Sequence, residues 1–401
     1  MRHFSLLFLF FFLLKVSAQD TPIPLSEEAD VSLLTVGPGK YLYDKFGHIA
    51  VRVKDPAQGI DAIFNYGSYD FNAPNFYVKF ARGKLLYNLD VNRYGPFMDY
   101  YKGQNRWIKE QVLNLNSEEK QGFFDFLVDN AKPENKSYNY DFFFDNCATK
   151  PRDVINEVLK GSLHYDNSYL KEQYTFRELI QMNVSANTWG SLGMDVAIGS
   201  VVDRVASPWE HQFLPNYVYQ ASANATINRN GSIEPLVRWD VDLFKNDPTE
   251  EKVNFFTSPL FVFGLIGLVI LFVTFRDRKR NTRSRYMDFT IFVLTGVIGI
   301  ILLLLWFATD QSATANNYNL LWAFPISLLA AFQVVKKNPA RWTRRFVLLL
   351  ILMLVLLCIH WISGVQGFAI GFIPLFVALG VRYLFLMGSL LQQSAETEAS
   401  A

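Results

Sequence analysis

The sequence predicts a two-part protein, in which an exported α+β domain precedes an all-α membrane domain of five helices. The N-terminus has the pattern of a secretory signal, residues 19–254 mix alternating strand patterns with helix signals, and apolar stretches dominate from about Phe255 onward. With 401 residues, 50% of them hydrophobic, the chain is long enough for both parts. Its net charge of +1 argues against nucleic acid as a partner.

The N-terminus predicts a signal peptide over residues 1–18. Arg2 and His3 precede an apolar stretch from Phe4 to Leu14, and the small residues of Val16-Ser17-Ala18 suit cleavage before Gln19. An uncleaved anchor helix is the alternative. No cysteine follows the predicted cleavage site, so the chain is not expected to be a lipoprotein itself.

The apolar stretches predict five membrane spans. Basic residues are concentrated in the first and third connectors between them, whereas the second and fourth contain no Lys or Arg, so the first and third are expected in the cytoplasm. This places an exported domain over 19–250, a transmembrane domain over 251–390 and a cytoplasmic tail over 391–401. The expected spans are residues 255–275, 289–308, 318–335, 346–362 and 367–388.

Cys147 is the candidate nucleophile. The other cysteine, Cys358, lies in an apolar helix, so we expect no disulfide and a free thiol in an oxidising compartment. An apolar strand runs into polar Asp145-Asn146, and Pro151 must lie in the first turn of the helix that follows. Backbone N–H groups at this helix entrance are expected to stabilise a thiolate and lower the pKa of Cys147. A buried small hydrophobe is the alternative interpretation.

His48 is the candidate base. The segment Tyr43 to Val53 alternates, with His48 on the same face as Ala50 and Arg52. A turn centred near Ala57 would bring Asn65 or Tyr66 across from the imidazole. A cysteine that attacks acyl carbons needs a histidine to take its proton and a polar group to orient that histidine.

Other residues remain open for these roles. Asn65 is the first candidate to orient His48, with Asp61 and Asp44 as alternatives, and His164 and His211 compete as bases. The sequence lacks a zinc-binding helix motif, a nucleophile-elbow motif and a complete phosphate-binding loop, so metal and nucleotide chemistry have little support.

The flanks of Cys147 supply further candidates. Asp145 and Arg152 either pair with each other or bind a substrate carboxylate or phosphate, and the ion pair is the first interpretation. Asn146 is a candidate for contact with the oxyanion or the substrate. The aromatic and helical signals between residues 72 and 135 are assigned to packing.

These features together resemble the lipoprotein N-acyltransferase family of Bacteroidota. The resemblance rests on Phe46-Gly47-His48, Asn65-Tyr66-Gly67, the run from Asp145 to Thr149 with Arg152-Asp153, and the five-span domain that follows. It implies a circularly permuted papain-like (NlpC-like) fold for the outward domain, in which the histidine strand precedes the cysteine helix.

The resemblance also implies a reaction and a location. Cys147 would take an acyl chain from a phospholipid as a thioester, and His48 would help to pass it to the α-amino group of a diacylglyceryl-cysteine on an apolipoprotein. Backbone N–H groups near Cys147 would hold the oxyanion, and no cofactor would be needed. The protein would be a multi-pass protein of the bacterial inner membrane with a periplasmic catalytic domain.

Two other functions stay open. The first is a papain-like cysteine hydrolase at the membrane surface, either a cell-wall amidase or peptidase or a phospholipase, because the same thioester serves transfer and hydrolysis. The second is a non-enzymatic membrane sensor or scaffold.

Overall fold

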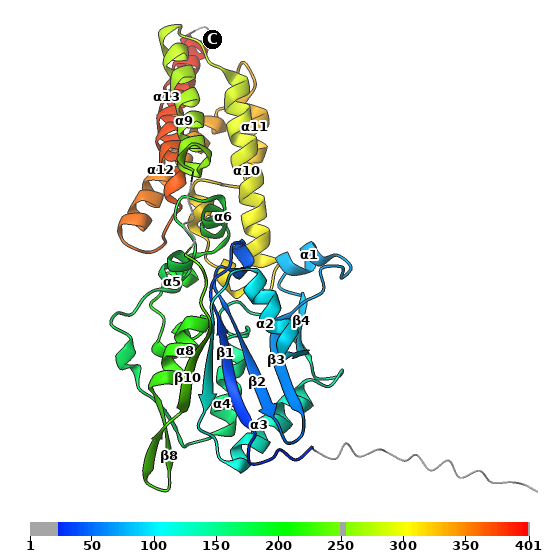
Figure 1. The fold of residues 1–401 in the computed structure, drawn as a ribbon. Helices are drawn as coiled ribbons and strands as arrows, with labels where there is room; N and C mark the ends of the chain where they lie inside the picture. The colour runs from blue at the N-terminus through cyan, green and yellow to red at the C-terminus, as the bar shows by residue number, and fades with distance from the viewer. Residues whose placement is uncertain (1–22, 249–253, 400–401) are drawn as a thin grey trace, which may run out of the picture.

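The structure is a computed structural model that describes residues 23–248 and 254–399. The predicted signal peptide over residues 1–18 lies outside them. A domain of strands and helices forms one end of the molecule and a bundle of long helices forms the other (Figure 1). The expected order of a mixed α/β domain followed by a helical domain is therefore confirmed.

Within the described residues, the N-terminal domain is built on an antiparallel sheet of seven strands in the order β10-β5-β1-β2-β3-β4-β6. A smaller sheet has the order β7-β8-β9. The strands are β1 (Asp30–Val36), β2 (His48–Asp55), β3 (Ile60–Ser68), β4 (Leu86–Arg93), β5 (Ile108–Leu113), β6 (Ser137–Asn139), β7 (Leu163–Tyr165), β8 (Ala225–Arg229), β9 (Ser232–Pro235) and β10 (Val237–Phe244).

The alternation of the central strands directs apolar side chains to both faces of the sheet. On one face, Ile49 and Val51 of β2 pack with the buried sides of α3 and α4. On the other, Ala50 packs with Phe97 and Met98 of α2. The helices of this domain are α1 (Phe76–Ala81), α2 (Tyr94–Gly103), α3 (Ser117–Asn130), α4 (Thr149–Val158), α5 (Phe176–Asn183), α6 (Trp189–Ala197), α7 (Pro208–His211) and α8 (Pro215–Asn224).

One strand begins later than its pattern predicts. Alternation suggests a start at Tyr43, but Leu42–Asp44 form the 3₁₀ turn η1 and β2 begins at His48. Gly47 has φ +81°, and a Cβ there would lie 2.8 Å from the carbonyl oxygen of Val36. Glycine tolerates this backbone conformation, so Gly47 turns the chain and sets His48 at the first position of the strand.

The helical domain confirms four of the five expected spans. Among the described residues, four helices are long and apolar enough to cross a membrane: α9 (Pro259–Lys279), α10 (Arg285–Phe307), α12 (Trp342–Ile362) and the Ile370–Gln393 part of the segment that contains α13 (Ile373–Ala399). Because α13 continues to Ala399, residues 391–399, expected as a tail, extend the last helix. The boundary predicted between the two domains, at residue 250, stays a prediction.

The stretch 318–335 does not form the single continuous helix that was expected, although it leads from the connector of Ser312, which binds the N-terminal domain, to Lys336 at the opposite end of the bundle. That stretch folds as the 3₁₀ turn η6 (Tyr318–Leu321) and the eight-residue helix α11 (Ser327–Val334). Pro325 lies between them and has no N–H for a continuous helix. Eight residues rise about 12 Å, well short of the ~30 Å hydrocarbon core. Trp322 and Ala323 are buried, so protein covers the irregular backbone.

The two basic connectors meet at the end of the bundle away from the sheet. Arg283 donates to the carbonyl of Lys336 at 2.6 Å, and the chain ends on the same side (Figure 1). At the opposite end, the N-terminal domain is hydrogen-bonded to the helical domain. Arg177 of α5 binds Asp203, whose carboxylate also accepts from the N–H of Gly367 at 2.9 Å.

Candidate functional site

The candidate nucleophile loop, residues 141–148 around Cys147, is shaped by side chains that bind its backbone. The Asn146 side chain accepts from the N–H groups of Ala148 (2.7 Å) and Thr149 (2.9 Å), and it donates to the carbonyls of Phe142 (2.6 Å) and Phe213 (2.9 Å). Its hydrogen-bonding capacity is therefore used within the protein. Asn146 caps the entrance of α4 and fixes Cys147 two residues before that helix.

The thiol of Cys147 lies against the start of β2. The backbone N–H of Ile49, the residue after His48, is directed at the sulfur, as is the N–H of Cys147 itself. Gly67, at the end of β3, lies on the other side: a Cβ there would be 3.3 Å from the Cβ of Cys147 and 4.0 Å from the ring of Tyr140. The two strands and the entrance of α4 thus converge on the sulfur.

Burial raises the pKa of the Cys147 thiol to about 11, and the two N–H groups and Arg106 oppose that rise only in part. The expectation of a lowered pKa is therefore wrong for the resting protein. The N–H groups of Ala148 and Thr149 donate to Asn146, so they are not directed at the sulfur. The thiol rests protonated at neutral pH.

The imidazole of His48 is held by Asn65. The Nε2 atom of His48 lies 2.6 Å from Oδ1 of Asn65, so this nitrogen carries the proton in the neutral ring and Nδ1 is the ring atom able to accept one. Burial, with Arg106 as a further cause, lowers the pKa of His48 to about 4. His48 is therefore a neutral base at physiological pH.

The contact between His48 and Asn65 is diagonal across the strands. The register of the hairpin pairs Val51 with Phe64, and one further step places Asn65 opposite Ala50. Ala50 shares a face with His48, so the longer side chains meet although they are not directly opposite.

The competing residues lie in other surroundings. Asp61 binds Arg52 at 2.7 Å, and buried Asp44 lies 3.9 Å from Arg106. His211 contacts the carbonyl of Ser207 through Nδ1 at 2.8 Å, and His164 is exposed on β7. Among the described residues, Asn65 is the hydrogen-bond partner of His48.

The predicted pairing of Asp145 with Arg152 is wrong. Asp145 binds Lys150 at 2.6 Å, whereas Arg152 binds Asp153 at 2.7 Å and stacks on Trp209 with its guanidinium carbon 3.8 Å from the ring centre. Arg152 is buried between α4 and α7. Asp145 keeps a partly exposed carboxylate next to the nucleophile loop.

Arg106 is a further candidate for the site that the sequence did not predict. It is buried in the turn before β5, donates to the carbonyl of Gly37 at 2.7 Å and lies over Tyr101, 4.8 Å from the ring centre. Its charge lowers the pKa of both His48 and Cys147, which places it near the two groups. Its Nη2 has no hydrogen-bond partner among the described residues. No local pattern separates Arg106 from the many other basic residues of the chain.

Comparison with known proteins identifies the family. The Lnb N-terminal periplasmic domain matches residues 25–182, and the Lnb transmembrane domain matches residues 250–394. The chain belongs to the Lnb family. This confirms the resemblance to the lipoprotein N-acyltransferases of Bacteroidota and makes the protein a membrane protein with a periplasmic domain. No curated protein and no solved structure matched the chain.

In this Lnb-family protein, the nucleophile loop also contacts the membrane domain. Asp141 accepts from the N–H groups of Phe143 and Phe144 through one carboxylate oxygen, and the other accepts from the hydroxyl of Ser312 at 2.7 Å. Ser312 belongs to the connector that follows α10. The loop that holds Cys147 is therefore fixed at the membrane-facing end of the periplasmic domain.

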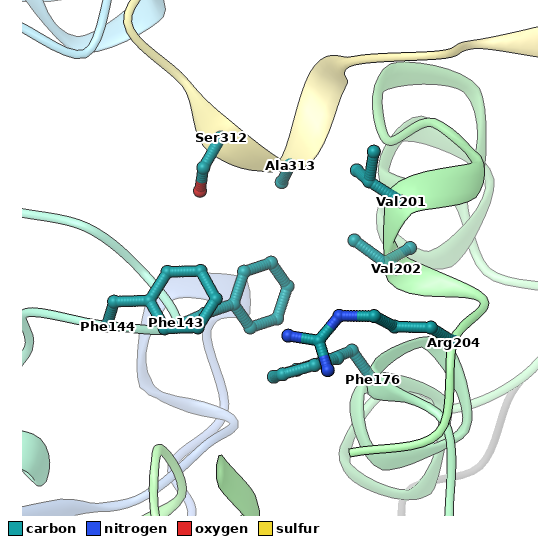
Figure 2. A pocket seen from close by; sticks show the side chains of 8 residues that line it. All are labelled: Phe143, Phe144, Phe176, Val201, Val202, Arg204, Ser312 and Ala313. Atoms are coloured by element: carbon teal, nitrogen blue, oxygen red, sulfur yellow. The ribbon is translucent and has the colours of Figure 1, made fainter. Parts of the chain in front are cut away.

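A cavity of about 180 Å³ lies behind this loop (Figure 2). Apolar side chains form most of its wall, and neither Cys147 nor His48 lines it. Its wall is shared by that loop, the connector after α10 and the turn after α6. The lining residues are Phe143, Phe144, Phe176, Val201, Val202, Arg204, Ser312 and Ala313.

Proposed function

We propose that this protein is a thiol acyltransferase that moves an acyl chain from a phospholipid, through a thioester on Cys147, to the α-amino group of a diacylglyceryl-cysteine on an apolipoprotein. Membership of the Lnb family supports the reaction class. The observation that carries the residue assignment is the convergence of Cys147 with the His48–Asn65 pair at the membrane-facing end of the sheet.

The first half-reaction forms the thioester. His48 takes the proton of Cys147 on Nδ1 while the sulfur attacks the ester carbonyl of the phospholipid. The bond from the carbonyl carbon to the glycerol oxygen then breaks, and His48 returns the proton to that oxygen, releasing a lysophospholipid. Because thiol and imidazole are both neutral at rest, we assign the proton transfer to the moment of attack.

The second half-reaction transfers the acyl group. The neutral amine of the acceptor attacks the thioester carbonyl, and His48 takes a proton from the nitrogen. The C–S bond breaks, the amide forms and the thiolate recovers its proton from His48. In both steps the N–H groups of Cys147 and Ile49 and the guanidinium of Arg106 supply positive charge near the developing oxyanion.

The remaining assigned residues position these groups. Asn65 orients His48, and Asn146 holds the nucleophile loop. Asp145 has a partly exposed carboxylate and is the residue of this set that is available to the acceptor amine. Arg152 is engaged by Asp153 and Trp209, so we assign it to the packing of α4.

Mass spectrometry of a lipoprotein's N-terminal peptide tests the proposal. Cells that lack this activity are complemented with wild type, Cys147→Ala or Cys358→Ala, the last being the matched control for a thiol outside the site. Wild type and Cys358→Ala should restore the N-acylated form, and Cys147→Ala should leave a free amine. Release of lysophospholipid and fatty acid with a free amine in every strain would favour the hydrolase instead.

A further inference from the structure

We propose that the aromatic segment, residues 69–84 with helix α1 at its centre, rests in the headgroup region of the outer leaflet and guides the acyl donor to Cys147. The contact with the bilayer is inferred from the structure of the segment and its surroundings alone. The delivery of the donor rests on the proposed function.

The aromatic segment exposes large side chains that pack on one another. Phe71, Tyr77 and Phe80 are 61%, 82% and 54% exposed. Phe71 contacts Phe76 with ring centres 5.1 Å apart, and Phe76 contacts Tyr77 at 5.3 Å and Phe80 at 6.4 Å. Helix α1 buries none of its residues. A patch of this kind on a protein surface indicates an apolar partner.

The segment is bound to the outer end of a membrane span. Helix α10 ends at Phe307, and three residues later the N–H of Asp310 donates to the carbonyl of Arg82 at 2.9 Å. The side chain of Gln311 donates to the carbonyl of Phe80 at 2.8 Å. Figure 1 shows α1 beside that end of α10. Aromatic rings at this height lie where a bilayer places its aromatic belts.

The charge of the segment suits a lipid surface. Lys79, Arg82 and Lys84 accompany the rings, with Asp70 as the one acidic residue between 69 and 84. Basic side chains next to inserted aromatic residues favour anionic headgroups. This combination, at the end of a span, favours a bilayer over a second protein as the occupant.

A continuous row of rings leads from this surface to the nucleophile. Phe71 contacts Tyr69 at 4.8 Å, Tyr69 contacts Tyr87 at 5.1 Å, and Tyr87 stacks on Tyr140 at 4.2 Å. Tyr140 borders Gly67, as does Cys147. Along this row an acyl ester leaves the bilayer while remaining in contact with apolar side chains.

Spin labelling of the full chain in nanodiscs tests the bilayer contact without turnover. A nitroxide is attached through Tyr77→Cys or, as a control, through Ile233→Cys, in a Cys147→Ser/Cys358→Ser background. Ile233 is 71% exposed on β9, next to β8 at the far end of the domain (Figure 1). We expect oxygen, which favours the bilayer, to relax the label at 77 more strongly than a water-soluble nickel chelate does. The control label at 233 should show the reverse.

Two results of this measurement would overturn the contact with the bilayer. A label at 77 that matches the control would place the segment in water. A label protected from both reagents would place it under protein, such as a second copy of the chain.

The delivery step is tested by comparing two acyl donors. Thioester formation on Cys147 is measured with vesicle phospholipid and with a short-chain soluble ester, for the triple variant Phe71→Ser/Tyr77→Ser/Phe80→Ser and for the control Ile233→Ser. The ratio of the vesicle rate to the soluble rate should fall at least tenfold in the triple variant and stay within twofold in the control. An unchanged ratio refutes the delivery role. If wild type forms no thioester from either donor, the proposed function itself fails, while the labelling result stands.

Discussion

Cys147 should be alkylated slowly at neutral pH, in contrast to an activated thiolate. With a thiol pKa of about 11, about 0.01% of Cys147 is ionised at pH 7, against about 3% for a free cysteine with a pKa of about 8.5. The deficit in thiolate is therefore about 300-fold. A thiolate of higher pKa is more nucleophilic, which offsets about tenfold of that deficit. We expect alkylation about 30-fold slower than that of free cysteine.

The assay is a pH series of iodoacetamide reaction on the full chain with Cys358→Ser, which leaves one thiol. The rate should rise about tenfold per pH unit from pH 7 to pH 10, because the ionised fraction does. Arg106→Gln should lower the rate at each pH, since this cation lowers the pKa of the thiol. Arg93→Gln, at an exposed arginine on β4, is the matched control and should leave the rate unchanged. A plateau below pH 7, or an Arg106→Gln rate equal to wild type, would refute the reasoning.

Three further predictions follow from the same geometry. The rate of thioester formation from a soluble ester should rise with pH through about 4 and stay level above it, because only neutral His48 accepts the thiol proton; an acid limb near 6.5 in the pH–rate profile of this step would contradict this. Gly67→Ala should lower the transfer rate tenfold or more, whereas Gly59→Ala, with a similar positive φ of +66° but open space around it, should cost little; equal rates would mean that the contact with Cys147 is unimportant. Asn146→Ala should reduce the free energy of unfolding in denaturant titration by about 2–4 kcal/mol, because four loop hydrogen bonds, three of them buried, lose a partner, and a loss below about 1 kcal/mol would argue against its capping role.

The local features of this protein were predictable because neighbours in the sequence determine them. The alternation around His48 indicates a strand, and the polar residues before Pro151 indicate a helix entrance after Cys147. The unbroken apolar stretches indicate membrane spans, and four of five fold as such. The break of the helix at 318–335 depends on whether other helices cover the irregular segment, which hydropathy does not report.

The contact of Asn65 could be predicted from the sequence, whereas the contacts of Asn146 could not. A short hairpin made Asn65 a candidate partner for His48, because a turn of few residues limits the register. The four hydrogen bonds of Asn146 were not predictable as a set, since one of them reaches Phe213, 67 residues away.

The sequence by itself therefore determined the two-part organisation, the single exported thiol and the residues that accompany it. The tertiary structure decided the charge state of the site. The pKa values of Cys147 and His48 depend on burial and on Arg106, which folding brings from a distant segment. Desolvation and Coulomb interactions act through space, so they are determined only when the chain has folded.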